Sequence, residues 1–356
     1  MKKVIILTKT NWNEPPRIRH QITRLLKEKG YEITYVEKNS YKSLFIKSRK
    51  EEGINFYSHA ELIHHQLRYF RFIQNLNNFV VKYYLKKIFK KVDFDFIMNF
   101  SYEYDFLKGL APSKKVITMM EDDFEAQAKF GMTRAIKNQI RSTCRNSDNV
   151  LTVSYPLFDK LSSYKNNVTM LFPWSQREYK KPKQNLDRNT VLYFGFIGRL
   201  DWKITESIIK NTKYNYRFVG PTIKNSDANF VNYLKETYSN FEHIGYSKIE
   251  ELEIDDVFCS ILPYDASLGN VQACTVSNRA FNLLSLGFPL VYADLRNLIK
   301  SPKTIIKTNI TLEEYIETLH FFHENFSSVQ KDIMTFLQSH YKESRWKVLE
   351  RIIPKK

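Results

Sequence analysis

Apolar and polar residues alternate along the chain in a pattern that predicts repeated strand–helix units. The short apolar run at residues 4–7 ends in a polar loop, as a buried strand does. After two prolines, an apolar face at helical spacing is formed by Ile18, Ile22, Leu25 and Leu26. Gly30 ends this helix, and residues 31–36 form a second strand. Two strands joined by a helix over about 36 residues favour parallel pairing with a right-handed crossover.

The same alternation continues along the rest of the chain. Further strands of the first half are expected at 94–99, 115–120, 149–154 and 168–174. The polar stretch 175–190 contains Pro182 and lacks periodicity, which indicates a linker. The segments TVLYFGFIG, YRFVGP, FEHIGY and VFCSILPY then restart the strand pattern, with a helix near 205–210. An α/β protein with two doubly wound domains is expected, at residues 1–174 and 191–328.

Composition limits the class of protein. A length of 356 residues with 43% hydrophobic content is enough for two cores. Cys144, Cys259 and Cys274 are widely separated and form no metal or disulfide pattern, which suits a reducing cytosol. The apolar run at 4–7 is too short for a signal peptide, and no window approaches the ~18–20 apolar residues of a membrane span. We expect a cytoplasmic protein, soluble or peripheral on the inner face of the cytoplasmic membrane.

Most of the net charge of +17 lies in the first half, where residues 1–172 hold 30 lysines and arginines and 17 acidic residues. Such a surface suits phosphates of nucleic acid, lipid or nucleotide, and a solvated lysine-rich surface is the alternative. Segment 66–92 has seven lysines and arginines and no acid. Its broad apolar coverage includes Tyr69, Phe72, Ile73, Leu76, Phe79, Val80, Tyr83 and Ile88. A helix of this kind either lies on an anionic membrane leaflet or packs on the sheet with its lysines in water.

The sequence GFIGRLDWK combines the end of a strand with two cations. Gly198 ends the strand, and Arg199 and Lys203 follow, four residues apart, at the entrance to a helix. A backbone turn, a helix N-terminus and two cations together form an anion site, and the spacing suits a diphosphate. The alternative is a surface ion pair with Asp201 or Glu206.

Two later strands also end in glycine. The residues concerned are Gly220 and Pro221 in FVGP, and His243, Ile244, Gly245 and Tyr246 in HIGY. Small residues at a strand end let a planar base approach the backbone, and the alternative for each motif is simply a turn.

The stretch SNRAFNLLSLGFPLV begins a helix and leads through a turn into a strand. Ser277 and Asn278 are good N-cap residues, and their backbone N–H groups would face an anion at that helix end together with Arg279. Arg279 therefore adds a third cation to Arg199 and Lys203.

The order of five motifs along the chain resembles the donor half of GT-B glycosyltransferases of bacterial surface polysaccharide assembly. These motifs are GRL…K, FVGP, HIGY, ILPY and SNRAFNLLSLGFPLV. The family pattern at the last motif is roughly Pro-x-Lys-x-Phe-Glu-Tyr-Leu-Ala-x-Gly-x-Pro-Val-Val. Ser277 stands for its proline, Arg279 for its lysine and Asn282 for its glutamate, while Gly287 and Pro289 match.

The resemblance implies two Rossmann-like domains facing across a cleft, with a C-terminal helix, 329–356, that crosses back to the first domain. The first domain would bind the acceptor through the loop of Asn11, Trp12, Asn13 and Arg17. In the second, Arg199, Lys203 and Arg279 would neutralise the donor diphosphate. The backbone near Gly220 and 243–246 would hold the base, and Asn282 the ribose. A metal is not expected, because cationic side chains usually replace it in this family.

Two departures from the family favour an inverting reaction. Cys274 stands where retaining members often carry a second acid, and TNWNEPP replaces the glycine-rich first loop of many relatives. An inverting reaction needs a carboxylate that deprotonates the acceptor hydroxyl. Glu121, Asp122 and Asp123 follow a predicted strand and are candidates for this base, with Glu103 as a rival. The alternative for the three acids is a solvated helix N-terminus.

The predicted function is transfer of a sugar from a nucleotide-sugar donor to a growing, lipid-linked polysaccharide acceptor such as capsule or lipopolysaccharide. One alternative is a nucleotide-sugar epimerase of the same architecture. Another, suggested by the charge, is a nucleic-acid-binding protein. Against the latter, the sequence shows no recognition helix, no RNA-binding aromatic motif and no zinc spacing.

Overall fold

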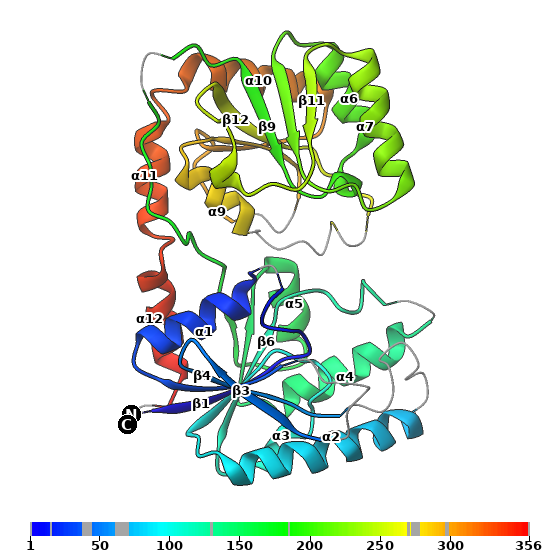
Figure 1. The fold of residues 1–356 in the computed structure, drawn as a ribbon, viewed down its shortest axis with the longest axis vertical. Coiled ribbons are helices and arrows are strands. Elements are labelled where there is room, and N and C mark those ends of the chain that lie inside the picture. The colour runs from blue at the N-terminus through cyan, green and yellow to red at the C-terminus, as the bar shows by residue number, and fades with distance from the viewer. Residues whose placement is uncertain are drawn as a thin grey trace. The chain divides into compact units, whose positions relative to one another are not determined.

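A computed structural model describes residues 2–14, 16–37, 45–60, 71–128, 131–183, 186–268, 271, 278–295 and 299–354, without the side chains of Arg71 and Asn278. The chain forms two compact units (Figure 1). Unit 1 consists of Met1–Pro173 together with Arg345–Lys356, and unit 2 consists of Trp174–Ser344. Each unit is an α/β structure built on its own sheet, which is parallel throughout in unit 2 and parallel except for one pair of strands at its edge in unit 1.

The sheet of unit 1 has the order β3-β4-β2-β1-β5-β6-β7-β8. Its strands are β1 (Lys3–Leu7), β2 (Glu32–Val36), β3 (Lys47–Glu51), β4 (Ile54–Ser58), β5 (Phe96–Asn99), β6 (Lys115–Met120), β7 (Asn149–Thr152) and β8 (Val168–Met170). All neighbours pair in parallel except β3 and β4. Central β1 sets the register, with Ile5 opposite Thr34 on one side and Ile97 on the other. Strand order reverses between β1 and β5, so unit 1 has its switch point there.

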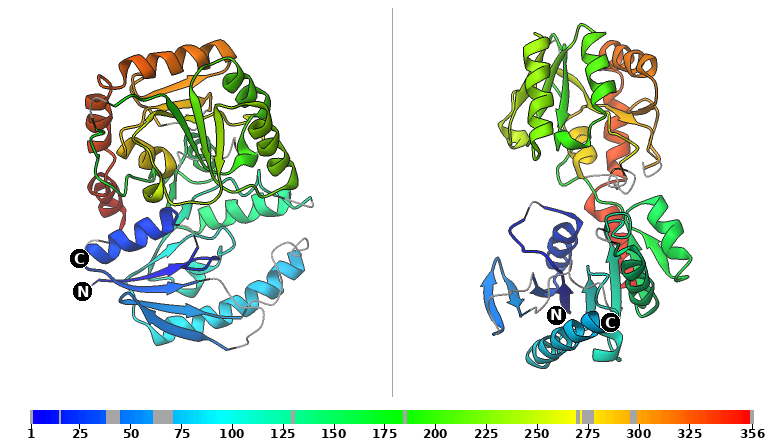
Figure 2. Two further views of the ribbon diagram at one scale, coloured as in Figure 1. Left: turned by 45° about the horizontal axis from the view of Figure 1, so that its top comes forward. Right: turned by 90° about the vertical axis from the view of Figure 1, so that its right-hand side faces the viewer.

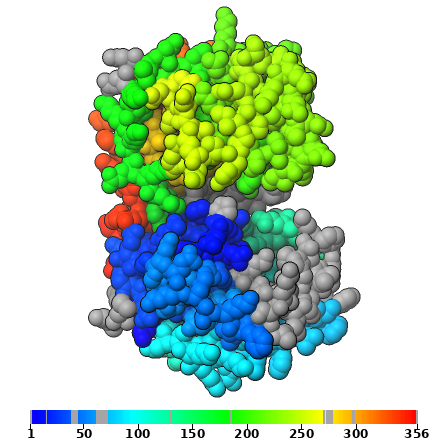
Figure 3. Space-filling view, viewed as in Figure 1, coloured from blue at the N-terminus to red at the C-terminus, as the bar shows by residue number. Residues whose placement is uncertain are grey.

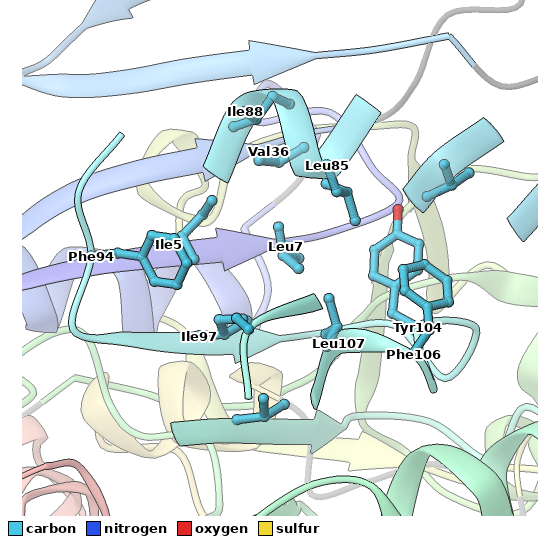
Figure 4. Close-up of a cluster of buried hydrophobic side chains, with 13 residues drawn as sticks. Ile5, Leu7, Val36, Leu85, Ile88, Phe94, Ile97, Tyr104, Phe106 and Leu107 are labelled. Carbon is cyan, nitrogen blue, oxygen red and sulfur yellow. The ribbon is translucent and has the colours of Figure 1, made fainter. Parts of the chain in front are cut away.

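The helices of unit 1 are α1 (Ile18–Glu28), α2 (Arg71–Lys91), α3 (Leu107–Leu110), α4 (Thr133–Arg145), α5 (Tyr155–Ser162) and the larger part of α12 (Lys342–Ile352). A main core lies between α2 and the sheet (Figure 4). Val81, Leu85 and Ile88 of α2 are fully buried in it against Ile5 and Ile97. This packing holds α2 on the sheet with one fixed face inward.

The sheet of unit 2 has the order β11-β10-β9-β12-β13-β14, and every pair is parallel. Its strands are β9 (Thr190–Phe194), β10 (Asn215–Val219), β11 (Phe241–Ile244), β12 (Val257–Leu262), β13 (Leu290–Ala293) and β14 (Ile306–Asn309). Its helices are α6 (Trp202–Lys210), α7 (Asn225–Thr237), α9 (Asn278–Ser285), α10 (Leu312–Asn325) and α11 (Gln330–Gln338), with short turns η2 (Ile197–Arg199) and η3 (Ile249–Glu251). Helices α6 and α7 lie next to each other (Figure 2), and α10 packs against α6. The switch point lies between β9 and β12.

The expected linker belongs to unit 2, and the C-terminal segment is shared between the two units. Residues 175–183 and 186–190 belong to unit 2, where the Tyr179 N–H donates to the Tyr341 hydroxyl at 3.0 Å. Helix α11 packs on α9 within unit 2. The chain rejoins unit 1 from Arg345, whose guanidinium donates to the carbonyls of Phe172 and Pro173 at 2.9 and 3.2 Å.

The strands and helices that were predicted begin and end within a few residues of the predicted positions. Differences of this size are common, because the ends of these elements are the least sharply defined. The pattern did not indicate the β3–β4 hairpin or β14, and the segment 329–356, expected as one helix, forms the two helices α11 and α12. Among the described helices, none has both the length and the hydropathy that crossing a bilayer requires.

Candidate functional site

In unit 2, the loops that follow β9 and β12 meet at the switch point of the sheet. The Asp201 N–H donates to the Pro263 carbonyl at 2.9 Å, and the Asp265 N–H donates to the Arg199 carbonyl at 2.9 Å. Leu200 and Tyr264 also form an isolated antiparallel bridge. These bonds tie the GFIGRLDWK motif to the ILPY motif. The crevice outside such a reversal is where open parallel sheets bind ligands.

Two glycines end neighbouring strands at this edge. Gly195 has φ +158° and Gly220 has φ +150°, a region that disfavours any side chain. The Gly195 N–H donates to the Val219 carbonyl at 2.8 Å, and the Gly220 N–H donates to the Ile244 carbonyl at 3.0 Å. A Cβ on Gly220 would overlap the Gly195 carbonyl oxygen. Both positions therefore require glycine for the strand ends to come this close.

Arg279 reaches the switch point from α9. Its guanidinium lies against Gly195, where a Cβ would overlap Nη1, and it donates a hydrogen bond to the Tyr264 hydroxyl. The arginine is the second residue of α9, so the positive end of the helix dipole adds to its charge. Tyr264 is buried and fixes the guanidinium beside the backbone of β9.

Arg199 contributes a second positive charge to the same place. Buried Tyr193 lies within the electrostatic influence of both arginines and donates its hydroxyl proton to the Phe196 carbonyl at 2.7 Å. Burial raises the pKa of Tyr193 well above its ordinary value, and the charges of Arg279 and Arg199 oppose that rise. Two guanidinium groups that act on one phenol indicate a local cationic site.

Lys203 is exposed in the first turn of α6. The Asp201 carboxylate caps that helix by accepting the Ile204 N–H at 3.0 Å. Glu206 accepts hydrogen bonds from Tyr233 and Tyr238 at 2.6 and 3.0 Å. The ammonium of Lys203 thus adds an exposed charge at the helix entrance.

Gly198 lies in the turn η2 and not at the strand end as predicted, because β9 already ends at Phe194. It lies against Asp227, an acid that sequence reasoning did not single out. A Cβ on Gly198 would lie 3.0 Å from Asp227 Oδ2. The buried carboxylate accepts the N–H groups of Ile223 and Lys224 at 3.2 and 3.1 Å, just after Pro221. Asp227 therefore braces the loop after β10. Its signal in the sequence was weak, because an acid in the first turn of a helix usually serves only as a cap.

The loop after β11 borders this site. His243 Nε2 lies 2.8 Å from the Gly220 carbonyl oxygen, and burial lowers the pKa of the imidazole. Ile244 is half-buried. Gly245 has open space around its Cα, and the Tyr246 ring is 78% exposed. This loop thus offers an accessible backbone and an exposed aromatic ring.

Asn282 lies one turn after Arg279 on α9 and is half-buried. Its backbone carbonyl accepts a hydrogen bond from the Ser285 hydroxyl at 2.7 Å. Ser277 and the side chain of Asn278 lie outside the described residues, so their predicted capping role stays a prediction.

In unit 1, a salt bridge spans the switch point between β1 and β5. Lys9 Nζ lies 2.8 Å from Glu103 Oε2 and 5.2 Å from the centre of the Tyr104 ring. Asn99 braces the loop after β5, since its amide donates to the Ser101 carbonyl at 2.8 Å. Glu103 is thus a buried, charge-paired carboxylate at the carboxyl edge of the sheet.

The three acids after β6 have different environments. Glu121 is paired with the buried guanidinium of Arg19, which also binds Glu14. Burial raises the pKa of Glu121, and the Arg19 charge opposes this shift. Asp123 pairs with Lys160 at 2.9 Å.

Asp122 is the most open of the three acids. Its side chain is 30% exposed, compared with 9% for Glu121 and 21% for Asp123. Its oxygen Oδ2 lies 3.8 Å from the exposed guanidinium of Arg17. Of the three, Asp122 is therefore the carboxylate best placed to meet a molecule from solvent.

The loop after β1 combines exposed polar residues with a buried ring. Asn11, Asn13 and Arg17 are exposed, whereas Trp12 is 5% exposed. The Trp12 ring packs against three aromatic rings, those of His20, Tyr35 and Phe56. Trp12 therefore anchors the loop in the core, and its polar neighbours form the accessible surface.

A polar groove of about 580 Å³ lies between α2 and α4 in unit 1. Its lining includes Gln74, Asn75, Asn78, Asp105, Arg134, Asn138 and Gln139. Helix α2 leads into β5 and α4 follows β6, so the beginnings of both helices lie at the carboxyl edge of the sheet. Amide side chains offer both donors and acceptors, as hydroxyl-rich ligands require.

Comparison with solved structures finds the same fold over the whole chain. The lipopolysaccharide outer core galactosyltransferase WaaB matches with a TM-score of 0.66 at 12% identity, over 98% of each chain. Sucrose-phosphate synthase from Thermosynechococcus elongatus matches with a TM-score of 0.66 at 10% identity, over 99% of this chain and 98% of its own. A variant of S. aureus TarM in complex with fondaparinux, α-GlcNAc-glycerol and UDP matches with a TM-score of 0.64 at 9% identity, over 100% of both chains.

No protein-family model matches the sequence, and neither does any characterised protein by sequence comparison. The structural matches and the two parallel sheets nevertheless agree. The chain has the GT-B fold, and the predicted fold class of two Rossmann-like α/β domains is confirmed.

Proposed function

We propose that this protein is a glycosyltransferase that moves a sugar from a nucleotide-sugar donor to a saccharide acceptor. The observation that carries the proposal is the position of Arg279 in unit 2. Its guanidinium lies against Gly195 at the switch point. The charges of Arg279 and Arg199 both act on the buried phenol of Tyr193. A chain with the fold of galactosyltransferase WaaB thus carries cations where a parallel sheet binds its ligand.

The donor would occupy the carboxyl edge of the unit 2 sheet. Arg279, Arg199 and Lys203 would neutralise the diphosphate, and no metal is expected to be needed for this. The nucleobase would lie on the backbone of Gly220 and the loop 243–246, and Asn282 would bind the ribose. The TarM variant structure that contains UDP supports a nucleoside diphosphate as the ligand class.

The acceptor would bind unit 1, with its saccharide in the amide-lined groove between α2 and α4 and along Asn11, Asn13 and Arg17. In an inverting reaction, the acceptor oxygen bonds to the anomeric carbon while the bond from that carbon to the diphosphate breaks. The hydroxyl proton passes to a carboxylate, for which we propose Asp122, because it is the most open acid after β6. The acceptor would be a growing, lipid-linked polysaccharide.

The first test is a thermal-shift panel of UDP, GDP, CMP, dTDP and ADP on the purified protein. A ligand that binds only the folded state raises the melting temperature. One nucleotide is expected to give a clear rise that Arg279→Ala abolishes. The matched control is Arg134→Ala, in the groove of unit 1, which should keep the rise. If none of the five nucleotides raises the melting temperature, the proposal is contradicted.

A second test separates transfer from epimerisation. The enzyme is incubated with the nucleotide sugar identified by the panel, with and without a saccharide acceptor. A transferase releases the nucleotide faster when the acceptor is present. Conversion of the donor to an isomer without acceptor would establish an epimerase instead.

A further inference from the structure

The outward face of α2 carries an apolar stripe. Phe72, Leu76, Phe79 and Tyr83 are 69%, 50%, 70% and 52% exposed. Their spacing of four, three and four residues places them on one side of the helix. Part of the surface that α2 contributes is visible in light blue and cyan in Figure 3. Large apolar side chains that gather in this way mark a binding surface rather than scattered exposure.

The helix cannot turn to hide this stripe. Val81, Leu85 and Ile88 occupy the opposite side of the helix, and each is buried in the core with 1% or less of its surface exposed. Leu85 and Ile88 are labelled in Figure 4. Rolling α2 would bring the stripe inward only by exposing these three residues to water. The apolar stripe is therefore a permanent feature of the surface of unit 1.

Lysines extend and flank the same face. Lys82, Lys86, Lys87, Lys90 and Lys91 are all exposed. Arg71–Lys91 contains no acidic residue. Lys87 Nζ lies 4.3 Å from the centre of the exposed Tyr83 ring, so charge and aromatic surface are adjacent. The face presents aromatic rings over its first three turns and positive charge over its last turns.

We propose that this face of α2 rests on an anionic phospholipid bilayer. Exposed aromatic residues enter the interfacial region of a bilayer, and lysines are attracted to anionic headgroups. A protein partner is a poorer fit, because lysine is depleted at protein–protein interfaces. The charge of the face therefore selects the lipid surface as its occupant.

This inference deepens the proposed function, and it rests on that function for the nature of the acceptor. The aromatic end of α2 begins at the carboxyl edge of the sheet, and Gln74, Asn75 and Asn78 of the same turns line the amide groove. A lipid-linked saccharide could thus keep its lipid in the membrane while its sugars lie in the groove.

Flotation with vesicles of phosphatidylglycerol and phosphatidylcholine tests the proposal on the full chain. The protein is expected to float with mixed vesicles and to stay in solution with pure phosphatidylcholine. The double variant Phe72→Ser/Phe79→Ser should weaken binding at least about tenfold, because it removes apolar surface that enters the interface. Lys86→Gln/Lys87→Gln/Lys90→Gln should weaken it by about fivefold per removed charge at low salt.

The matched control is Ile310→Ser, which removes a 69% exposed apolar residue from unit 2 and should leave flotation unchanged. All variants should melt like the wild type, since the changed side chains are exposed. Flotation unaffected by the α2 variants would overturn the proposal. So would a wild-type dimer in sedimentation that Phe72→Ser/Phe79→Ser dissociates, because the face would then bind a second copy. The nucleotide thermal shift of the same variants reports on the donor site separately.

Discussion

Arg279 and Gly195 are 84 positions apart in the chain, yet the arginine guanidinium packs directly on the glycine backbone. The contact exists because Gly195 has no Cβ and adopts φ +158° at the end of β9. It joins the first strand of unit 2 to the start of α9 at the switch point. The proposed diphosphate site therefore depends on a glycine that carries no chemistry of its own.

Gly195→Ala should displace the Arg279 guanidinium and weaken nucleotide binding at least about tenfold, because the arginine is proposed to make a charge-assisted contact with the phosphate. The strained backbone should also lower the free energy of unfolding by about 1–3 kcal/mol. Isothermal titration with the nucleotide and urea unfolding measure the two effects. Gly109→Ala is the matched control, because a Cβ there meets nothing within 4 Å and Gly109 lies in α3 of unit 1, outside the proposed donor site. Equal nucleotide affinities for both variants would contradict the assignment.

Much of this site follows from sequence pattern alone, and the reasons are local. Strands buried on both faces are continuous apolar runs, and glycine at their ends indicates close backbone approach. The contact of Arg279 with Gly195 could not be predicted, since it depends on how α9 packs against the sheet. Strand β3 was missed because KSRKE has no apolar face, and its pairing with β4 is what makes it a strand. The burial of Trp12 likewise depends on Tyr35 and Phe56, which are distant in sequence.

Asp122→Asn should lower kcat about 10²–10⁴-fold, because an amide cannot accept the acceptor proton. Its nucleotide affinity should stay at the wild-type value, since the residues proposed to bind the donor lie in unit 2. Initial rates at saturating donor and acceptor, with titration of the nucleotide, separate the two quantities. Asp123→Asn is the comparison: it breaks the pair with Lys160 and should change stability more than kcat. A full loss of kcat in Asp123→Asn with an active Asp122→Asn would assign the base to Asp123.

Variants of the amide-lined groove should change KM for the acceptor and leave KM for the donor unaltered. Asn75→Ala/Asn138→Ala removes two exposed amides from opposite walls of the groove. Each lost hydrogen bond should weaken acceptor binding, so that KM for the acceptor rises about tenfold in total while KM for the donor is unchanged. Asn167→Ala, an exposed asparagine outside the groove, is the control for unit 1. Unchanged acceptor KM in the double variant would place the saccharide elsewhere.

His20 predicts a pH dependence of stability that originates in unit 1. Its Nδ1 accepts the Arg17 N–H at 3.0 Å and its Nε2 lies 2.9 Å from the Trp12 carbonyl oxygen, so the buried ring is satisfied only when neutral. Burial, together with the charges of Arg19, Arg24 and Arg17, lowers the pKa of His20 from 6.5 to about 4. Between these two values the unfolded chain binds a proton that the folded protein excludes.

The free energy of unfolding should therefore be highest above pH 6.5 and fall as the pH drops from 6.5 towards 4, with about 3 kcal/mol of the loss due to His20. Urea unfolding of the wild type and of His20→Gln at pH 4.5, 5.5, 6.5 and 7.5 isolates this part, because glutamine does not titrate. His323→Gln, which replaces an exposed imidazole of unit 2, should follow the wild-type profile. If the free energy of unfolding of His20→Gln depends on pH in the same way as that of the wild type, then the His20 imidazole is not held neutral in the folded protein.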